Sequence, residues 1–188
     1  MQRIYVFFGM VASGKSTLAQ SFADRYDMPY YNTDRVRKEL AGLTPTSRRP
    51  DGINRGIYTS AFSRHTYQVM QDRARKDLQE GQRGVVLDGS YHSRQERDKV
   101  RLMADDLGVN WVFIQCVCHD DEVRRRLAKR SRDPESVSDG RWEVYQSQKK
   151  TFESPDELPP AGLVVLHTER EVDVLLQSLA DILDRKTI

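Results

Sequence analysis

The segment that most constrains the fold of this chain is Gly9–Thr17, which reads GMVASGKST and fits the pattern G-x-x-x-x-G-K-[ST]. Two glycines allow the backbone to turn tightly enough for successive N–H groups to point inward at phosphate oxygens, and a following helix would present its positive end to the same anion. The motif therefore predicts a nucleoside triphosphate site in which Lys15 contacts the β- and γ-phosphates and Ser16 ligates Mg²⁺. The residues expected to bind the nucleotide are Gly9, Ala12, Ser13, Gly14, Lys15, Ser16 and Thr17.

The residues on either side of this segment predict the strand and the helix that the motif requires. Ile4–Phe8 is a short apolar run that is typical of a buried strand. After the motif, apolar residues recur at helical spacing as far as Tyr26. The motif thus lies between a predicted strand and a predicted helix, as a phosphate-binding loop requires. This context argues against a chance match to the pattern.

Length and composition favour a single domain over residues 1–188. With 188 residues and 38% hydrophobic content, the chain is large enough for one well-buried core and too short for two. Short apolar runs alternate with longer amphipathic segments, and this rhythm is typical of a parallel sheet with helices on both faces. The predicted strands are 4–8, 29–32, 84–88, 111–118 and 163–166. The predicted helices are one that follows the glycine loop, then 33–40, 57–80, one opened by a capping box at Ser93–Glu96, 120–132, 138–152 and a last one capped by Thr168–Glu171.

The sequence shows no sign of export or membrane insertion. Met1–Arg3 leads directly into the first predicted strand without a leader of signal-peptide form, and no apolar run approaches the ~20 residues of a membrane span. We therefore expect a cytoplasmic protein without a membrane partner. Cys116 and Cys118 fall in one predicted strand and are expected to be buried, reduced thiols, since two ligands are too few for a metal site.

A candidate acid lies directly after the second predicted strand, in Asn32–Arg37. Ligands of an open parallel sheet bind beyond the carboxyl ends of its strands, so polar residues at that position are candidates for chemistry. Asp34 and Arg37 are three residues apart and share one side of a helix start. Asp34 can take a proton from an attacking hydroxyl, while Arg37 holds a phosphate or orients the acid. The alternative is that Asp34 only favours the helix N-terminus.

A second acid, Asp88, ends the apolar strand 84–88. An aspartate at this position orients Mg²⁺, its water shell or an acceptor group, so Ser16 and Asp88 are the candidate metal residues. The structural alternative is a turn residue that precedes Gly89.

The run 124–132 is rich in arginine and precedes a polar turn that contains Pro134. Arg126 and Arg130 are four residues apart and lie on one side of the predicted helix. The position favours a lid over about residues 124–140, whose arginines close over a transferring phosphoryl group. A solvated helix face and a contact with nucleic acid are the alternatives.

Four features in this order resemble the 5′-hydroxyl kinase domain of the bacteriophage polynucleotide kinase: the glycine loop, NTDRVR at 32–37, LDGSY at 87–91 and the arginine-rich helix. The chain also resembles gluconate kinases, chloramphenicol phosphotransferase, zeta toxins and bacterial ATP-binding proteins with DRVRKELAG, as at 34–42. The resemblance covers nearly the whole chain. It implies a three-layer P-loop NTPase fold of the α/β class, with a five-stranded parallel sheet and an arginine-rich lid.

The resemblance also implies roles for individual residues. Lys15 and Ser16 correspond to the nucleotide and metal residues, and Asp34 to the general base. Arg37 matches an arginine that binds the acceptor, Asp88 a second acid, and Arg126 and Arg130 lid arginines; the catalytic set is Lys15, Asp34, Arg126 and Arg130. The segment 90–93 and the region Arg48–Tyr67 do not match these families, which leaves the acceptor open.

The predicted function is transfer of the γ-phosphoryl group of ATP, with Mg²⁺, to a hydroxyl on a small molecule or on a nucleic-acid 5′ end. A carboxylate base at Asp34 favours an alcohol acceptor, because an acceptor that is already anionic needs no base. One alternative is a non-catalytic ATP-binding switch or a slow ATPase, which needs none of the acceptor residues. A toxin-like kinase acting on a nucleotide sugar is a third.

Overall fold

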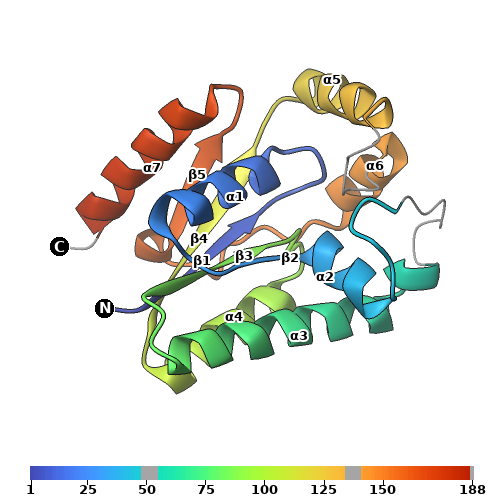
Figure 1. The fold of residues 1–188 in the computed structure, drawn as a ribbon. Helices are drawn as coiled ribbons and strands as arrows, with labels where there is room; N and C mark the ends of the chain where they lie inside the picture. Colours follow the sequence, from blue (N-terminus) through green and yellow to red (C-terminus); the bar gives the residue numbers. More distant parts are fainter. Residues whose placement is uncertain (48–54, 134–140, 187–188) are drawn as a thin grey trace.

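A five-stranded parallel sheet forms the centre of the molecule, in the strand order β2-β3-β1-β4-β5 (Figure 1). The computed structural model describes residues 1–47, 55–133 and 141–186. The strands are β1 (Arg3–Phe8), β2 (Tyr30–Asn32), β3 (Gly84–Asp88), β4 (Asn110–Val117) and β5 (Leu163–His167). The predicted fold class is confirmed, and all five predicted strands are present.

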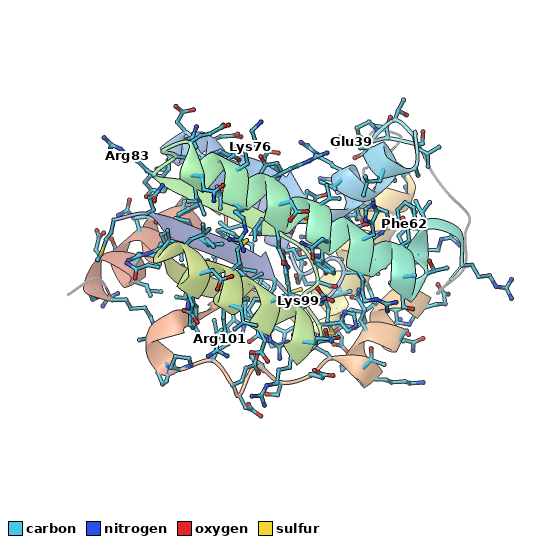
Figure 2. All side chains as sticks on the ribbon, turned by 90° about the horizontal axis from the view of Figure 1, so that it is seen from below. Glu39, Phe62, Lys76, Arg83, Lys99 and Arg101 are labelled. Atoms are coloured by element: carbon cyan, nitrogen blue, oxygen red, sulfur yellow. The ribbon has the colours of Figure 1, made fainter. Side chains whose placement is uncertain are left out.

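Helices cover both faces of this sheet. They are α1 (Lys15–Tyr26), α2 (Thr33–Leu40), α3 (Ser60–Gln79), α4 (Arg94–Leu107), α5 (Asp120–Ser131), α6 (Trp142–Thr151) and α7 (Val172–Lys186). One face is covered by α1 and α7, and Figure 2 shows α3 and α4 side by side over the other. Helices α5 and α6 lie beyond the carboxyl ends of the strands (Figure 1), where they pack on Val11 and Ala12.

The central strands β1 and β3 are buried because both of their faces carry apolar side chains. Every residue of β3 is buried, and Ile4, Val6, Phe7 and Phe8 of β1 are fully buried. Alternate residues of β1 therefore contribute to two cores, one under α3 and α4 and one under α1 and α7. Continuous apolar runs of this kind are what a doubly covered parallel strand requires.

Two helix starts, those of α3 and α7, differ from the sequence prediction. Helix α3 begins at Ser60 instead of residue 57, because the Thr59 hydroxyl caps it at Phe62 N–H and Gly56–Tyr58 forms a separate 3-10 turn. Helix α6 is described from Trp142, and the predicted start at residue 138 lies outside the described residues.

The expected cap at Thr168 is wrong. A helix capped by Thr168 would begin at residue 169, but helix α7 begins at Val172. The Thr168 hydroxyl donates instead to the Ser13 carbonyl. The cap at Ser93 is confirmed, since its hydroxyl accepts from Glu96 N–H at 3.3 Å. The Glu96 carboxylate pairs with Lys99.

The two cysteines are free thiols in different surroundings. Cys116 of β4 is buried, and burial raises the pKa of its thiol to about 12, so it stays protonated at neutral pH. Cys118 follows the strand and is half-buried. Within the described ranges, no helix has the length and apolar character needed to span a membrane.

An ion pair buried under the sheet is expected to stabilise the fold. Arg97 Nε of α4 lies 2.5 Å from Glu157 Oε1, and the two side chains are 0% and 2% exposed. Arg97 also donates to the carbonyls of Tyr91 and Ser154. The pair therefore ties α4 to the segment before β5.

Glu157→Gln is expected to lower the free energy of unfolding by about 3 kcal/mol, because it leaves the Arg97 charge buried without a compensating anion. Urea denaturation measures the change. Asp98→Asn is the matched control, since Asp98 pairs with Arg94 and Arg101 where all three side chains are partly exposed, and should contribute less than about 1 kcal/mol. An equally small change for Glu157→Gln would contradict the assigned role.

Candidate nucleotide and acceptor site

The loop between β1 and α1, residues 9–14, is here called the phosphate loop, and its backbone shape requires glycine at two positions. Gly9 and Gly14 have φ values of 141° and 85°. A Cβ atom at Gly9 would lie 2.4 Å from the Cys116 carbonyl oxygen, and one at Gly14 would lie 2.8 Å from Arg126 Nη1. The two glycines of the motif are therefore needed for conformation and for space.

Helix α1 presents its N-terminus to this loop. Gly14 is the N-cap residue and offers no side-chain acceptor, and no acidic residue lies in the first turn. The N–H groups at a helix start attract an anion. The Lys15 ammonium donates to the Met10 carbonyl at 3.3 Å and thus lies over the loop. The arrangement can bind a phosphate chain between the α1 N-terminus and the Lys15 charge.

Asp88 is held at the carboxyl end of β3 with one oxygen occupied and one without a partner. Asp88 Oδ2 accepts from the Tyr30 hydroxyl at 2.7 Å and from Asn32 Nδ2 at 2.5 Å. Oδ1 is buried and has no hydrogen-bond partner. Burial and the adjacent carboxylate raise the pKa of Tyr30, so this hydroxyl remains a donor. Asp88 is thus more than a turn residue.

The residues around Asp88 Oδ1 fit a hard cation such as Mg²⁺. Asn32 Nδ2 lies 3.5 Å from the Ser16 hydroxyl, so Ser16 and Asp88 share a neighbour. Within the described part of the chain, no group of three or more His, Cys, Asp or Glu residues is arranged to hold a metal. Mg²⁺ requires fewer protein ligands, because it keeps several waters and binds substrate phosphates together with one or two protein oxygens.

Asp34 and Arg37 form an ion pair at the start of α2. Asp34 Oδ1 lies 2.9 Å from Arg37 Nη1, and the side chains of Arg37 and Asp34 are 10% and 25% exposed. The Arg37 guanidinium also lies over the Tyr58 ring, 5.0 Å from its centroid. Of the two roles predicted for Arg37, the geometry favours orientation of the acid.

Asn32 connects this pair with Asp88. Its Oδ1 accepts from the N–H groups of Asp34 and Arg35, both at 3.0 Å, and so caps α2, while its Nδ2 donates to Asp88. Asn32 and Asp88 are direct neighbours in the β2–β3 register. One buried amide therefore fixes the start of α2 relative to the end of β3.

The two predicted lid arginines have different surroundings. Arg126 donates to Glu122, to the Ala12 carbonyl at 3.2 Å, and to both the hydroxyl and the carbonyl of Thr168. Burial, and then the charge of Arg126, lower the pKa of Arg130, whereas Asp34 and Asp88 act in the opposite direction. Arg130 thus lies within electrostatic range of both carboxylates, and Arg126 is bound to the phosphate loop.

The neighbouring arginines of α5 also contact protein groups. Arg124 stacks on the Trp142 ring at 3.6 Å, and Arg125 pairs with Glu122. These contacts favour a structural role for this part of the run over a contact with nucleic acid. The rest of the predicted lid, from Pro134 to Gly140, lies outside the described residues.

A chain of polar side chains lies on the other side of the site. The Ser90 hydroxyl lies 3.1 Å from the Tyr67 hydroxyl and 3.3 Å from His92 Nδ1. The Gly9 N–H donates to the Ser90 carbonyl, so this chain adjoins the phosphate loop. Burial lowers the pKa of His92, which therefore favours the neutral form. The predicted acceptor region Arg48–Tyr67 is described only from residue 55 onward.

Comparison with protein families and curated proteins gives related sequences. A family model described as an AAA domain matches residues 4–155. Uncharacterized proteins of Mycobacterium tuberculosis (strain ATCC 25618 / H37Rv) and Mycobacterium bovis are each 30% identical over 129 residues. The matched stretch is 69% of this chain and 26% of each relative, so the chain spans about a quarter of the curated relatives that it matches.

Several solved structures of kinases share the fold over nearly their whole length. A sugar kinase from Janibacter sp. has a TM-score of 0.67 at 19% identity and covers 98% of this chain and 95% of its own. A gluconokinase from Sinorhizobium meliloti has a TM-score of 0.64 at 19% identity, with 98% and 92% covered. The APS kinase of Mycobacterium tuberculosis, in complex with AMPPNP and APS, has a TM-score of 0.66 at 17% identity, with 97% of both chains covered.

Proposed function

This chain belongs to the AAA domain family, and we propose on that premise that it is an ATP- and Mg²⁺-dependent kinase that phosphorylates a hydroxyl group. The observation that carries the proposal is the Asp34–Arg37 ion pair, which Asn32 connects to Asp88. A module that only binds ATP needs no oriented carboxylate at this position. The kinase titles of the structures with this fold are consistent with the proposal.

In the proposed reaction the phosphate loop and Lys15 bind the triphosphate, and Asp34 accepts the proton of the acceptor hydroxyl. The hydroxyl oxygen bonds to the γ-phosphorus while the bond from that phosphorus to the β–γ bridging oxygen breaks, and ADP leaves. Arg37 holds the Asp34 carboxylate in a fixed orientation. Arg130 offsets the charge of the transferring group. When bound at Ser16 and Asp88, Mg²⁺ would neutralise phosphate charge.

The acceptor that the geometry supports best is an uncharged hydroxyl compound such as a sugar. The Arg37 charge is matched by Asp34 at 2.9 Å, and its guanidinium face is covered by Tyr58. An arginine so engaged has less charge to offer a phosphate group of the acceptor than the polynucleotide kinase resemblance implies. We propose one kinase domain over residues 1–188, with the nucleic-acid 5′ end as the second acceptor to be tested.

The test is incubation with γ-labelled ATP, Mg²⁺ and a panel of sugars, aminoglycosides and 5′-hydroxyl oligonucleotides. We expect label on a hydroxyl compound of the panel. An oligonucleotide already phosphorylated at its 5′ end is the matched control and should remain unlabelled. Label found only as free phosphate would contradict the proposal and favour a slow ATPase or a nucleotide switch.

A further inference from the structure

Three side chains, from α5, from α6 and from the segment after β5, bind the backbone of consecutive residues in the phosphate loop. The bonds are Val11 N–H to Gln148 Oε1 of α6 at 2.7 Å, Arg126 Nη1 of α5 to the Ala12 carbonyl at 3.2 Å, and the Thr168 hydroxyl after β5 to the Ser13 carbonyl at 2.6 Å. We propose that Gln148, Arg126 and Thr168 are positioning residues that hold this loop in the shape that binds phosphate. The proposal rests on the proposed nucleotide site.

The loop needs such support because part of its backbone is strained. Ala12 has a φ of 61°, in the left-handed region that disfavours residues with a Cβ atom. A residue in this region keeps its conformation only where its surroundings fix it. Arg126 binds the Ala12 carbonyl itself, and Val11 and Ala12 are buried against Val123 and Leu127 of α5.

The Thr168 bond determines where one phosphate-binding group points. In a planar trans peptide, the carbonyl of one residue and the N–H of the next point in opposite directions. Thr168 holds the Ser13 carbonyl on its own side of the loop, so the Gly14 N–H is directed to the opposite side. Thr168 is 3% exposed, and its hydroxyl also accepts from Arg126 Nη1 at 3.0 Å.

The Arg126 and Thr168 bonds are linked, so helix α5 is tied to the loop. Arg126 binds Thr168 and the loop, and its Nε donates to Glu122 at 2.6 Å. A guanidinium fixed on several sides holds a neighbouring carbonyl more firmly than a free side chain does. Arg126 therefore acts on phosphate through the loop backbone, while Arg130 lies within range of Asp34 and Asp88.

The decisive substitution is Thr168→Val, which removes the hydroxyl and preserves the shape of the side chain. We expect it to weaken the binding of MgATP and of inorganic tripolyphosphate about tenfold, as loss of one buried hydrogen bond does. Thr168→Ser keeps the hydroxyl and should restore both affinities. Thr151→Val, at the exposed end of α6, is the matched control and should bind as the wild type does.

Isothermal titration calorimetry with tripolyphosphate separates the loop from the nucleoside part of the site. Thr168→Val that binds tripolyphosphate as tightly as the wild type would overturn the proposal, even if its melting temperature fell. Gln148→Met and Gln148→Glu form a second, independent pair of variants, because of these two residues only Glu keeps an acceptor for the Val11 N–H. Equal affinities of the two variants for tripolyphosphate would also overturn the proposal. Failure of the kinase proposal is distinguishable, since the wild type would then bind MgATP and label no acceptor.

Discussion

Lys15→Ala is expected to lower the rate of phosphoryl transfer by about a thousandfold or more and to leave the fold intact. The Lys15 ammonium lies over the phosphate loop, where it contacts the Met10 carbonyl at 3.3 Å. In a bound triphosphate its charge would act on the β- and γ-phosphates, whose negative charge shifts during transfer. The Lys15 amine is not needed to form helix α1, so the free energy of unfolding should change little.

The rate is measured with the best acceptor of the panel, and the fold by circular dichroism and thermal unfolding. Lys76→Ala is the matched control, because the Lys76 side chain is 74% exposed on α3 and pairs with Glu80 at 3.8 Å. Its rate should equal that of the wild type. Comparable transfer by Lys15→Ala and the wild type would reject the assignment of the loop.

Asp34→Asn is expected to lower kcat by about 10²- to 10⁴-fold and to leave the affinity for MgATP unchanged. The substitution keeps the size of the side chain and its hydrogen bond to Arg37, but an amide oxygen cannot take the proton of the attacking hydroxyl. The Asp34 carboxylate contacts Arg37, and the Asp34 N–H donates to Asn32 Oδ1. The loss should therefore appear in kcat and not in nucleotide binding.

Asp72→Asn on the exposed face of α3, where Asp72 accepts from Gln68, serves as the control and should have no effect. Steady-state kinetics gives kcat and KM for the acceptor, and calorimetry gives the nucleotide affinity. Equal losses in kcat and in MgATP affinity would make Asp34 a binding residue. A variant with wild-type kcat would exclude general-base catalysis by Asp34.

The sequence was sufficient to predict the parts of the molecule that depend on local patterns. Gly9–Thr17 follows a buried strand and precedes a helix, as the pattern requires. Asp88 was found because it ends an entirely apolar run, and every residue of that strand is buried. Such patterns are local, because an apolar run that predicts a buried strand and a periodicity that predicts a helix both lie within a short stretch of consecutive residues.

The side chains that complete the site were missed because they come from distant parts of the chain. Gln148 binds a residue 137 positions away, and Thr168 binds one 155 positions away. The sequence predicts a helix cap at Thr168, since a threonine three residues before Glu171 has the local pattern of a capping box. Tyr30, which donates to Asp88, fell within a predicted strand and carried no signal of its own.

Asn32 could have been identified more precisely from the sequence. An asparagine immediately before a predicted helix is a common N-cap, and Asn32 does cap α2. Its second role, the bond to Asp88, depends on β2 and β3 being neighbours in the sheet. The strand order β2-β3-β1-β4-β5 is not written in local periodicity, because non-consecutive strands pair through crossovers.

The arginine-rich helix illustrates the limit of spacing arguments. Arg126 and Arg130 were interpreted together because they are four residues apart. In the structure the two arginines have different neighbours. Arg126 donates hydrogen bonds to Ala12 and Thr168, whereas the charges of Asp34 and Asp88 act on Arg130. Spacing places both on one side of α5, and only the packing of that helix decides which of them reaches each group.

Isothermal titration calorimetry of the wild-type protein with ATP in the presence of Mg²⁺ tests the central claim most directly, because every further step depends on the phosphate loop holding a triphosphate. The account predicts saturable heat for one nucleotide per chain, and loss of that heat when Gly14, where a Cβ atom would lie 2.8 Å from Arg126 Nη1, is replaced by valine. No heat from ATP or GTP with the wild type would contradict it.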